Sequence, residues 1–158
     1  MAADTLKKQD IKGIEVTKPE HPAFFDPSTL PWTPWVMEDT WFKLMRLDKK
    51  TGGFTMFLKV GAGNEAPIHG HLGAVEAYVI EGEFGYDEDR GGVGSYVYEE
   101  AGINHMPTAP DGVTMFAIAH GPLMGYNEDG SIAVVIDGKT MYQMAKANNA
   151  ADHIYEGY

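Results

Sequence analysis

The sequence predicts an all-β fold: a single-domain jelly-roll barrel that ends in one short helix. From Trp41 onward, short segments of alternating apolar and polar residues recur, and glycines separate them. Only residues 139–148 carry apolar residues at helical spacing. Many short strands joined by glycine turns are typical of a sandwich or barrel of the jelly-roll type. The 158 residues are enough for one sizeable core and too few for two.

The strands follow from the alternation of apolar residues. Residues 54–60 alternate Phe54, Met56, Leu58 and Val60 with Thr55, Phe57 and Lys59, which predicts a half-buried strand. The further strands are expected, in chain order, as two strands around Gly82 within residues 78–86, then at residues 95–98, 113–120 and 132–136. A turn is expected over residues 87–92. The predicted helix presents Met141, Met144 and Ala145 on one stripe.

The chain divides into an arm at residues 1–35, a barrel at residues 36–136, and a helix with a tail at residues 137–158. Residues 19–35 contain five prolines, two phenylalanines and two tryptophans. Proline forbids a regular helix here, yet a cluster of aromatic residues favours burial over full contact with water. We expect this segment to pack across a sheet or onto a second subunit, and we expect a homodimer or homotetramer.

Charge and cysteine content exclude several function classes. The formal net charge of −11 argues against nucleic acid and against an anionic membrane surface. The chain has no cysteine, so disulfides, thiolate metal sites and cysteine nucleophiles are excluded. The N-terminal residues lack the apolar core of a signal peptide, and no run reaches the length of a membrane span. We therefore expect a cytoplasmic protein.

Three histidines are the candidate metal ligands. His69 and His71 are one residue apart, so on a strand their side chains project to the same side. His105 follows a glycine turn at Gly102 and can complete one face of a site. Imidazole suits zinc, iron, copper and nickel.

The spacing of these histidines resembles the two sequence signatures of the cupin superfamily. The residues that match the first signature are Gly63, His69, His71, Glu76 and Gly82. Those that match the second are Gly94, Gly102 and His105. The resemblance covers about residues 40–120 and implies a jelly-roll barrel that holds a metal ion.

Glu76 is a further candidate ligand, although its spacing departs from the signature. Counted back from Gly82, the carboxylate position of many cupins falls on Val75. A shift of one residue along a strand turns a side chain to the other face. Two alternatives stay open: a bulge near Gly73 brings Glu76 to the metal, or the site is three histidines with water.

A closer resemblance is to the acetylacetone-cleaving dioxygenase and the 2,4'-dihydroxyacetophenone dioxygenases. It lies in residues 69–82, in Ala119-His-Gly-Pro-Leu and in Tyr126-Asn-Glu-Asp-Gly, and it extends to about residue 145. It implies Fe(II) bound by three histidines. A second resemblance, through residues 46–55, is to the zinc-binding cupin domain of anti-sigma factors, in which a glutamate joins the histidines.

The dioxygenase resemblance also implies roles for Glu99 and Thr108, which stand six residues before and three residues after His105. A carboxylate near a ligand imidazole can accept its second N–H and orient the ring. The arginine expected in that group has no counterpart, because Asp87 occupies its position and Arg90 is nearby. His120 is expected to be structural.

The dioxygenase resemblance, together with these residues, implies a non-haem Fe(II) dioxygenase that cleaves a carbon–carbon bond beside a carbonyl, with a β-diketone or an aryl hydroxyketone and dioxygen as substrates. The residues that bind the organic substrate are not identified by the sequence. One alternative is a zinc- or nickel-binding cupin that binds or senses a small molecule. Another is a metal-dependent isomerase or lyase, since one fold supports many functions.

Overall fold

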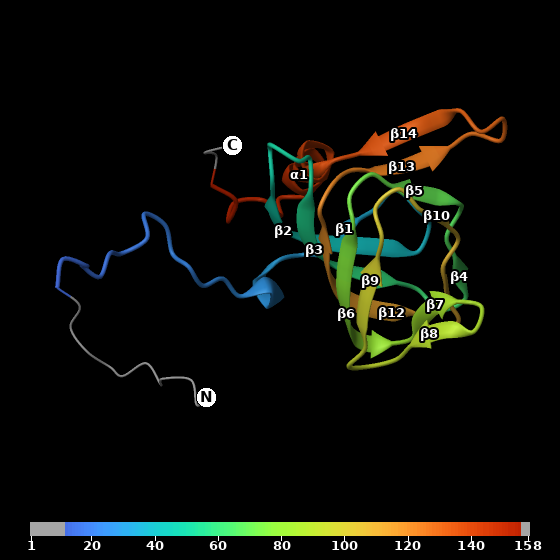
Figure 1. Ribbon diagram of the computed structural model, residues 1–158, viewed down its shortest axis with the longest axis horizontal. Coiled ribbons are helices and arrows are strands. Elements are labelled where there is room, and N and C mark those ends of the chain that lie inside the picture. Colours follow the sequence, from blue (N-terminus) through green and yellow to red (C-terminus); the bar gives the residue numbers. More distant parts are fainter. Residues whose placement is uncertain (1–11, 156–158) are drawn as a thin grey trace, which may run out of the picture.

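The computed structural model describes residues 12–155, whose regular elements are antiparallel strands, a short 3₁₀ helix η1 (Pro27–Thr29) and one C-terminal α-helix (Figure 1). The six-stranded sheet has the order β1-β2-β3-β12-β6-β9. Its strands are β1 (Thr33–Pro34), β2 (Thr40–Leu47), β3 (Phe54–Val60), β12 (Val113–Ala119), β6 (Val75–Gly82) and β9 (Tyr96–Glu99). This arrangement confirms the predicted all-β fold with one short C-terminal helix.

Two four-stranded sheets complete the barrel. One has the order β10-β5-β13-β14 and the other the order β4-β11-β7-β8. The strands of the first are β10 (Asn104–His105), β5 (His69–His71), β13 (Leu123–Tyr126) and β14 (Ile132–Ile136). Those of the second are β4 (Asn64–Glu65), β11 (Thr108–Ala109), β7 (Phe84–Tyr86) and β8 (Asp89–Gly91).

The structure differs from the predicted turn over residues 87–92. Residues 89–91 form strand β8, which pairs with β7 and leaves only Asp87 and Glu88 to connect the two strands. Asp87 has a φ of 39°, the left-handed conformation that asparagine and aspartate tolerate better than most residues in a tight turn. The polar composition of residues 87–92 therefore predicted a turn where the chain forms a short hairpin.

The six-stranded sheet has a buried inner face and an outer face. Along β12 the residues alternate between buried and half-buried, with Met115 and Ala117 on the inner side. Phe42 and Leu44 of β2 and Val79 of β6 are fully buried on the same side. The core also includes residues of the other two sheets, namely Leu123, Ile136 and Ala109. The inner face of the six-stranded sheet is thus largely apolar.

Helix α1 (Gly138–Ala147) packs against β2 at one end of the barrel. Asp137 caps its N-terminus, where its side chain accepts a hydrogen bond of 2.8 Å from the Thr140 N–H. Met141 and Ala145, on the predicted stripe, are fully buried. None of the helices within residues 12–155 is long and apolar enough to cross a membrane.

The predicted arm has two parts in the structure. Residues 33–34 form β1 at the edge of the six-stranded sheet, and residues 27–32 lie over β2, where Lys43 donates 2.9 Å to the Pro27 carbonyl. Before residue 27 the chain passes the C-terminal tail, where Phe25 stacks on His153 with ring centroids 4.3 Å apart, and then leads away from the barrel (Figure 1). Phe24 is 96% exposed. The parts of the predicted arm and tail at residues 1–11 and 156–158 lie outside the described residues.

Candidate metal centre

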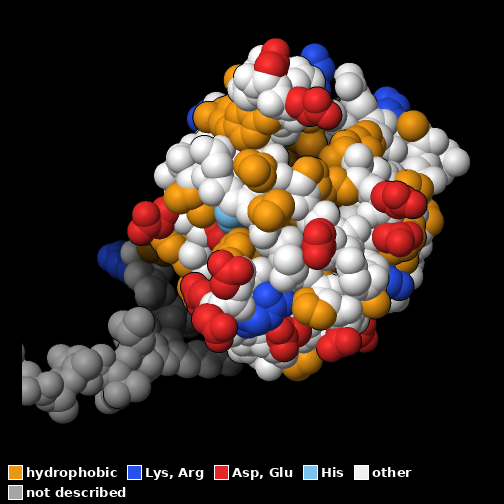
Figure 2. Space-filling view, turned by 90° about the vertical axis from the view of Figure 1, so that its right-hand side faces the viewer, with side chains coloured by type: hydrophobic (Ala, Val, Ile, Leu, Met, Phe, Trp, Pro, Cys, Tyr) orange, Lys and Arg blue, Asp and Glu red, His pale blue; other side chains and the backbone are white. Residues whose placement is uncertain are grey.

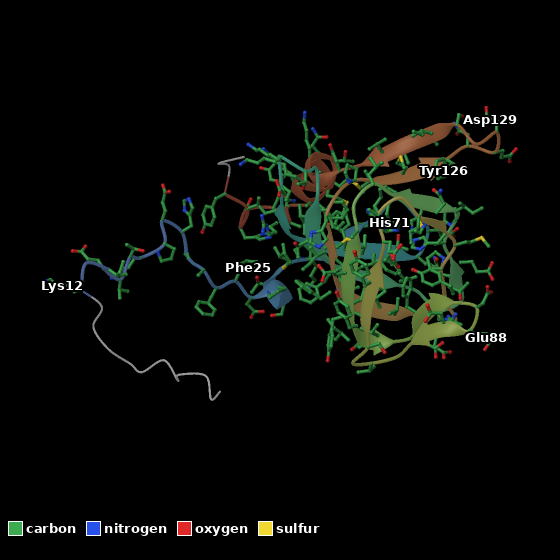
Figure 3. The ribbon with its side chains drawn as sticks, in the orientation of Figure 1. Lys12, Phe25, His71, Glu88, Tyr126 and Asp129 are labelled. Atoms are coloured by element: carbon green, nitrogen blue, oxygen red, sulfur yellow. The ribbon has the colours of Figure 1, made fainter. Side chains whose placement is uncertain are left out.

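Three histidine side chains converge inside the barrel. Strand β5 carries His69 and His71, and strand β10 pairs with it so that His105 lies directly opposite His69. The Nε2 atom of His105 is 2.7 Å from Nε2 of His71 and 2.9 Å from Nε2 of His69. Figure 3 shows His71 in the interior, between the sheets. The predicted cluster therefore forms.

Gly70 separates the two histidines of β5 because no side chain fits there. A Cβ atom at this position would lie 2.5 Å from the Tyr126 hydroxyl and 2.6 Å from Oδ1 of Asn104. These two atoms form a hydrogen bond of 2.6 Å, in which the Tyr126 hydroxyl donates. The glycine lets this bond cross β5 and tie β13 to β10 behind the histidines.

The imidazoles are neutral at ordinary pH. Burial lowers the pKa of all three, and it lowers that of His71 to about 3 and that of His105 to about 4, with help from the neighbouring histidines. Nδ1 of His69 lies 2.9 Å from the Pro67 carbonyl, which can only accept, so this nitrogen carries the ring proton. Nε2 of His69 therefore presents a lone pair to the other two histidines.

The donor set fits a transition metal ion. The candidate ligand atoms of the three histidines all lie within 4.8 Å of one another. Neutral imidazole nitrogens that point at one centre are the ligands that zinc, iron, copper and nickel accept. The three histidines could therefore hold a metal ion, and the geometry leaves its identity open.

Glu99 lies beside this centre, on the side where the Nε2 atoms meet. Its Oε2 atom is 3.4 Å from Nε2 of His71 and 3.7 Å from Nε2 of His105. The sequence predicted that Glu99 would accept the second N–H of a ligand imidazole, which would be at Nδ1. The structure corrects that expectation: β9 runs beside β6, and its last residue points into the barrel toward the converging nitrogens.

Tyr86 holds Glu99 in place. The Tyr86 hydroxyl donates to Oε1 of Glu99, and its ring stacks on His105 with a centroid separation of 5.0 Å. Burial raises the pKa of Glu99, while the hydrogen bond from Tyr86 acts in the opposite direction. Burial, followed by the bond to Glu99, raises the pKa of Tyr86, so its hydroxyl stays a donor. The sequence analysis did not identify Tyr86.

Thr108 lies at the centre's edge and is held by Arg90. Nη1 of Arg90 donates 2.9 Å to Oγ1 of Thr108, and Nη2 donates 3.1 Å to its carbonyl. Nε of Arg90 donates to Glu83. Arg90 reaches Thr108 because the hairpin of β7 and β8 lies next to β11. Recognising residues 89–91 as a strand would have pointed to this pair.

Glu76 does not lie with the histidines. Strand β6 pairs with β12 without a register shift at Glu76, so Val75 faces the barrel interior and Glu76 faces outward. There it accepts hydrogen bonds of 2.6 Å from the Tyr96 hydroxyl and from Nε2 of His120. This geometry corrects the inclusion of Glu76 among the candidate ligands, because no bulge turns it inward. It also gives His120 the structural partner that was expected.

The histidines border an apolar pocket of about 300 Å³. Val75, Met56 and Met115 line it from the six-stranded sheet, and Met124 and Tyr126 line it from β13. No lysine or arginine of the described residues lines it. On the face of the molecule in Figure 2, a histidine is visible among hydrophobic side chains, with an acidic side chain beside it. The pocket suits a ligand that is apolar apart from one polar group.

The fold and the histidine cluster together define a cupin with a candidate metal centre. The chain belongs to the ChrR cupin-like domain family, whose model matches residues 20–124. No protein of curated function matches the chain significantly.

Solved structures give the same fold assignment. A cupin protein from Ralstonia eutropha is 28% identical, with a TM-score of 0.74 over 85% of this chain and 95% of that one. A proposed acetylacetone dioxygenase from Methylibium petroleiphilum is 21% identical, with a TM-score of 0.72 over 82% and 97%. The acetylacetone dioxygenase of Acinetobacter johnsonii is 18% identical, with a TM-score of 0.69 over 89% and 99%. The two dioxygenase likenesses show the cupin fold.

Proposed function

We propose that this protein is a non-haem Fe(II) dioxygenase that cleaves a carbon–carbon bond next to a carbonyl in a β-diketone or an aryl hydroxyketone. The observation that carries the proposal is the cluster of three neutral imidazoles at the edge of an apolar pocket. His69, His71 and His105 would hold the metal. Structural neighbours that include acetylacetone dioxygenases support the same reaction class.

The donor set favours an anionic substrate. The three imidazoles are neutral, and burial raises the pKa of Glu99, the carboxyl group beside them, so much of the charge of the cation is left for an enolate to balance. When bound, Fe(II) would act as a template and Lewis acid that makes such an enolate reactive toward dioxygen. A fourth ligand from Glu76 would have opposed this chemistry, but Glu76 lies on the outer face, bonded to Tyr96 and His120.

The chain's own residues would orient the substrate and exclude water. The apolar wall of the pocket would take the alkyl or aryl substituents, and the chelating oxygens would face the histidines. Glu99 lies within 3.7 Å of two of the Nε2 atoms, in reach of a group bound at the centre. Its carboxyl group, with a pKa raised by burial, would exchange a proton with a bound substrate or water.

Oxygen uptake by the Fe(II)-loaded protein tests this function. We would add a panel of β-diketones and hydroxyacetophenones, each with a carboxylated analogue. The proposal expects one dioxygen consumed per substrate, with both oxygen atoms in the products, and slower turnover of the charged analogues. His105→Ala protein, treated with iron in the same way, is the control. Absence of uptake across the panel, with bound iron verified, would overturn the proposal.

Membership of the ChrR cupin-like family favours a second candidate, a zinc- or nickel-loaded cupin that binds or senses a small molecule without redox chemistry. The same neutral histidines accept these ions. Zinc-loaded protein that binds an apolar diketone by calorimetry, together with iron-loaded protein that consumes no dioxygen, would favour this candidate.

A further inference from the structure

A sheet face in contact with water normally carries polar side chains. The outer face of the six-stranded sheet carries aromatic side chains instead. They occur on each of the five strands from β2 to β9 and are Trp41, Phe57, Phe116, Tyr78, Tyr96 and Tyr98. Tyr78, Tyr96 and Tyr98 are 52%, 64% and 58% exposed. A contiguous apolar area of this kind marks an interaction surface.

Four of these residues form one row across the sheet. The register places Phe57 opposite Phe116, Phe116 opposite Tyr78, and Tyr78 opposite Tyr96. The rings of Phe57 and Phe116 are in edge contact, with centroids 5.3 Å apart. The row is therefore a continuous aromatic strip through the middle of the face.

Charges flank this strip with opposite signs on its two sides. In the neighbouring row, Lys59 of β3 and Glu81 of β6 lie on either side of Thr114 of β12. Lys43 adds a positive charge on β2, and Glu76 adds a negative one on β6. β12 is the central strand between the two sides, since the order is β2-β3-β12-β6-β9.

We propose that this face packs against the same face of a second copy of the chain, about a two-fold axis parallel to β12. Such an axis places β3 of one copy opposite β6 of the other. It sets Lys59 against Glu81 of the second copy, and Phe57 against Tyr78, and each contact occurs twice because the interface is isologous. Charge complementarity thus favours a second copy over an unrelated partner, and face-to-face sheets are a common packing.

The described part of the chain's own arm covers only one edge of this face and leaves Tyr78, Tyr96 and Tyr98 exposed. Residues 27–32 reach the β2 and β3 edge, where the Trp32 ring lies 4.8 Å from Nζ of Lys43 and 5.9 Å from Nζ of Lys59. Farther along the arm, Phe24 is almost fully exposed and so covers nothing. The predicted homodimer would therefore form through the sheet, and the metal centre on the inner face would stay accessible.

Sedimentation velocity of the whole chain across the micromolar range tests the proposal. We expect a reversible dimer. Tyr78→Glu should place a charge opposite Phe57 of the second copy and leave the protein monomeric. Ile132→Glu is the matched control, because Ile132 is 56% exposed on β14, away from this face, and should leave the dimer intact.

A charge exchange separates the interface from a folding defect. Lys59→Glu and Glu81→Lys should each raise the dimer dissociation constant about tenfold at low ionic strength, because each sets like charges together. The double variant should restore the dimer. A mixture of the two single variants should form heterodimers, because the new carboxylate of one chain then meets the new ammonium group of the other. Circular dichroism would verify that each variant is folded.

Three results would overturn the proposal. The first is a monomer at every concentration. The second is a dimer that neither Tyr78→Glu nor the charge variants weaken. The third is a dimer lost in Phe24→Glu but kept in Tyr78→Glu, which would assign the contact to the arm.

Discussion

Glu99 and Glu76 lie on adjacent strands of one sheet, yet their environments are opposite. The register pairs Glu99 with Val75 and Glu76 with Tyr98, so the two carboxyl groups are one position out of step and point to opposite faces. Glu99 is 6% exposed, and burial raises its pKa. The side chain of Glu76 is 36% exposed, and hydrogen bonds from Tyr96 and then His120 lower its pKa.

This contrast shows that the face of the sheet on which a glutamate lies, and not the residue type, determines its pKa and its possible role. The inner carboxyl group borders the histidines and an apolar pocket, where a raised pKa suits proton exchange. The outer one is held by two hydrogen bonds on a surface that we propose to be an interface. A spacing argument that ignores strand pairing cannot separate these two glutamates.

The largest expected effect contrasts a histidine of the inner face with Glu76. His105→Ala should weaken metal binding by more than about 100-fold, since it removes a ligand, whereas Glu76→Ala should keep one metal per chain. Metal content after dialysis against a weak chelator, determined by mass spectrometry, measures this. Loss of metal in Glu76→Ala would reverse the assignment of the two faces.

The two glutamates themselves provide the next test. Glu99→Gln should reduce metal affinity about 10–100-fold, because it removes a carboxyl group beside two ligand nitrogens. Glu76→Gln should change affinity less than about twofold. Chelator competition on both variants gives the ratio. Equal effects would show that the inner position of Glu99 has no special role.

The pH dependence of the metal-free protein should also separate the faces. His71 and His105 have pKa values lowered to about 3 and about 4, while unfolded histidine protonates near 6.5. The unfolded state therefore binds more protons between these values, so stability falls as the pH drops below 6.5, by on the order of 1–2 kcal/mol for each histidine at pH 5.

Glu76 affects the stability of the folded protein in a lower pH range than the histidines do. Its lowered pKa contributes stability above the ordinary value of 4.5, and this contribution is lost only as the pH falls through the folded pKa. Denaturant titrations from pH 7 to pH 4 would measure both. His105→Ala should flatten the slope between pH 6.5 and 5, and Glu76→Gln should not. A slope unchanged by His105→Ala would contradict the neutral histidine cluster.

The smallest effect concerns the support behind the histidines. Gly70→Ala should destabilise the protein by about 1 kcal/mol, because the new methyl group breaks the bond between Tyr126 and Asn104. Gly92→Ala is the matched control, since its Cβ would meet nothing closer than 3.8 Å. Thermal unfolding of both variants measures the difference. An equal loss in the two would show that the bond behind β5 contributes nothing.

Local sequence was sufficient for the features that depend on period and spacing. Alternation in residues 54–60 and the apolar run at 132–136 matched β3 and β14, and the stripe of Met141 and Ala145 matched the buried side of α1. The clustering of His69, His71 and His105 followed from two short motifs. The fold class was predictable for the same reason, because each of these patterns is written within a few consecutive residues.

Strand pairing settled the rest, because register depends on residues far apart in the chain. Pairing of β6 with β12 turned Glu76 outward, and pairing of β6 with β9 turned Glu99 toward the ligand nitrogens. The β7–β8 hairpin brought Arg90 to Thr108, and Tyr86 to Glu99. Residue patterns alone were enough to specify an all-β chain with three clustered histidines. Which carboxyl group joins them depends on the folded sheet, since one residue of register separates the inner face from the outer.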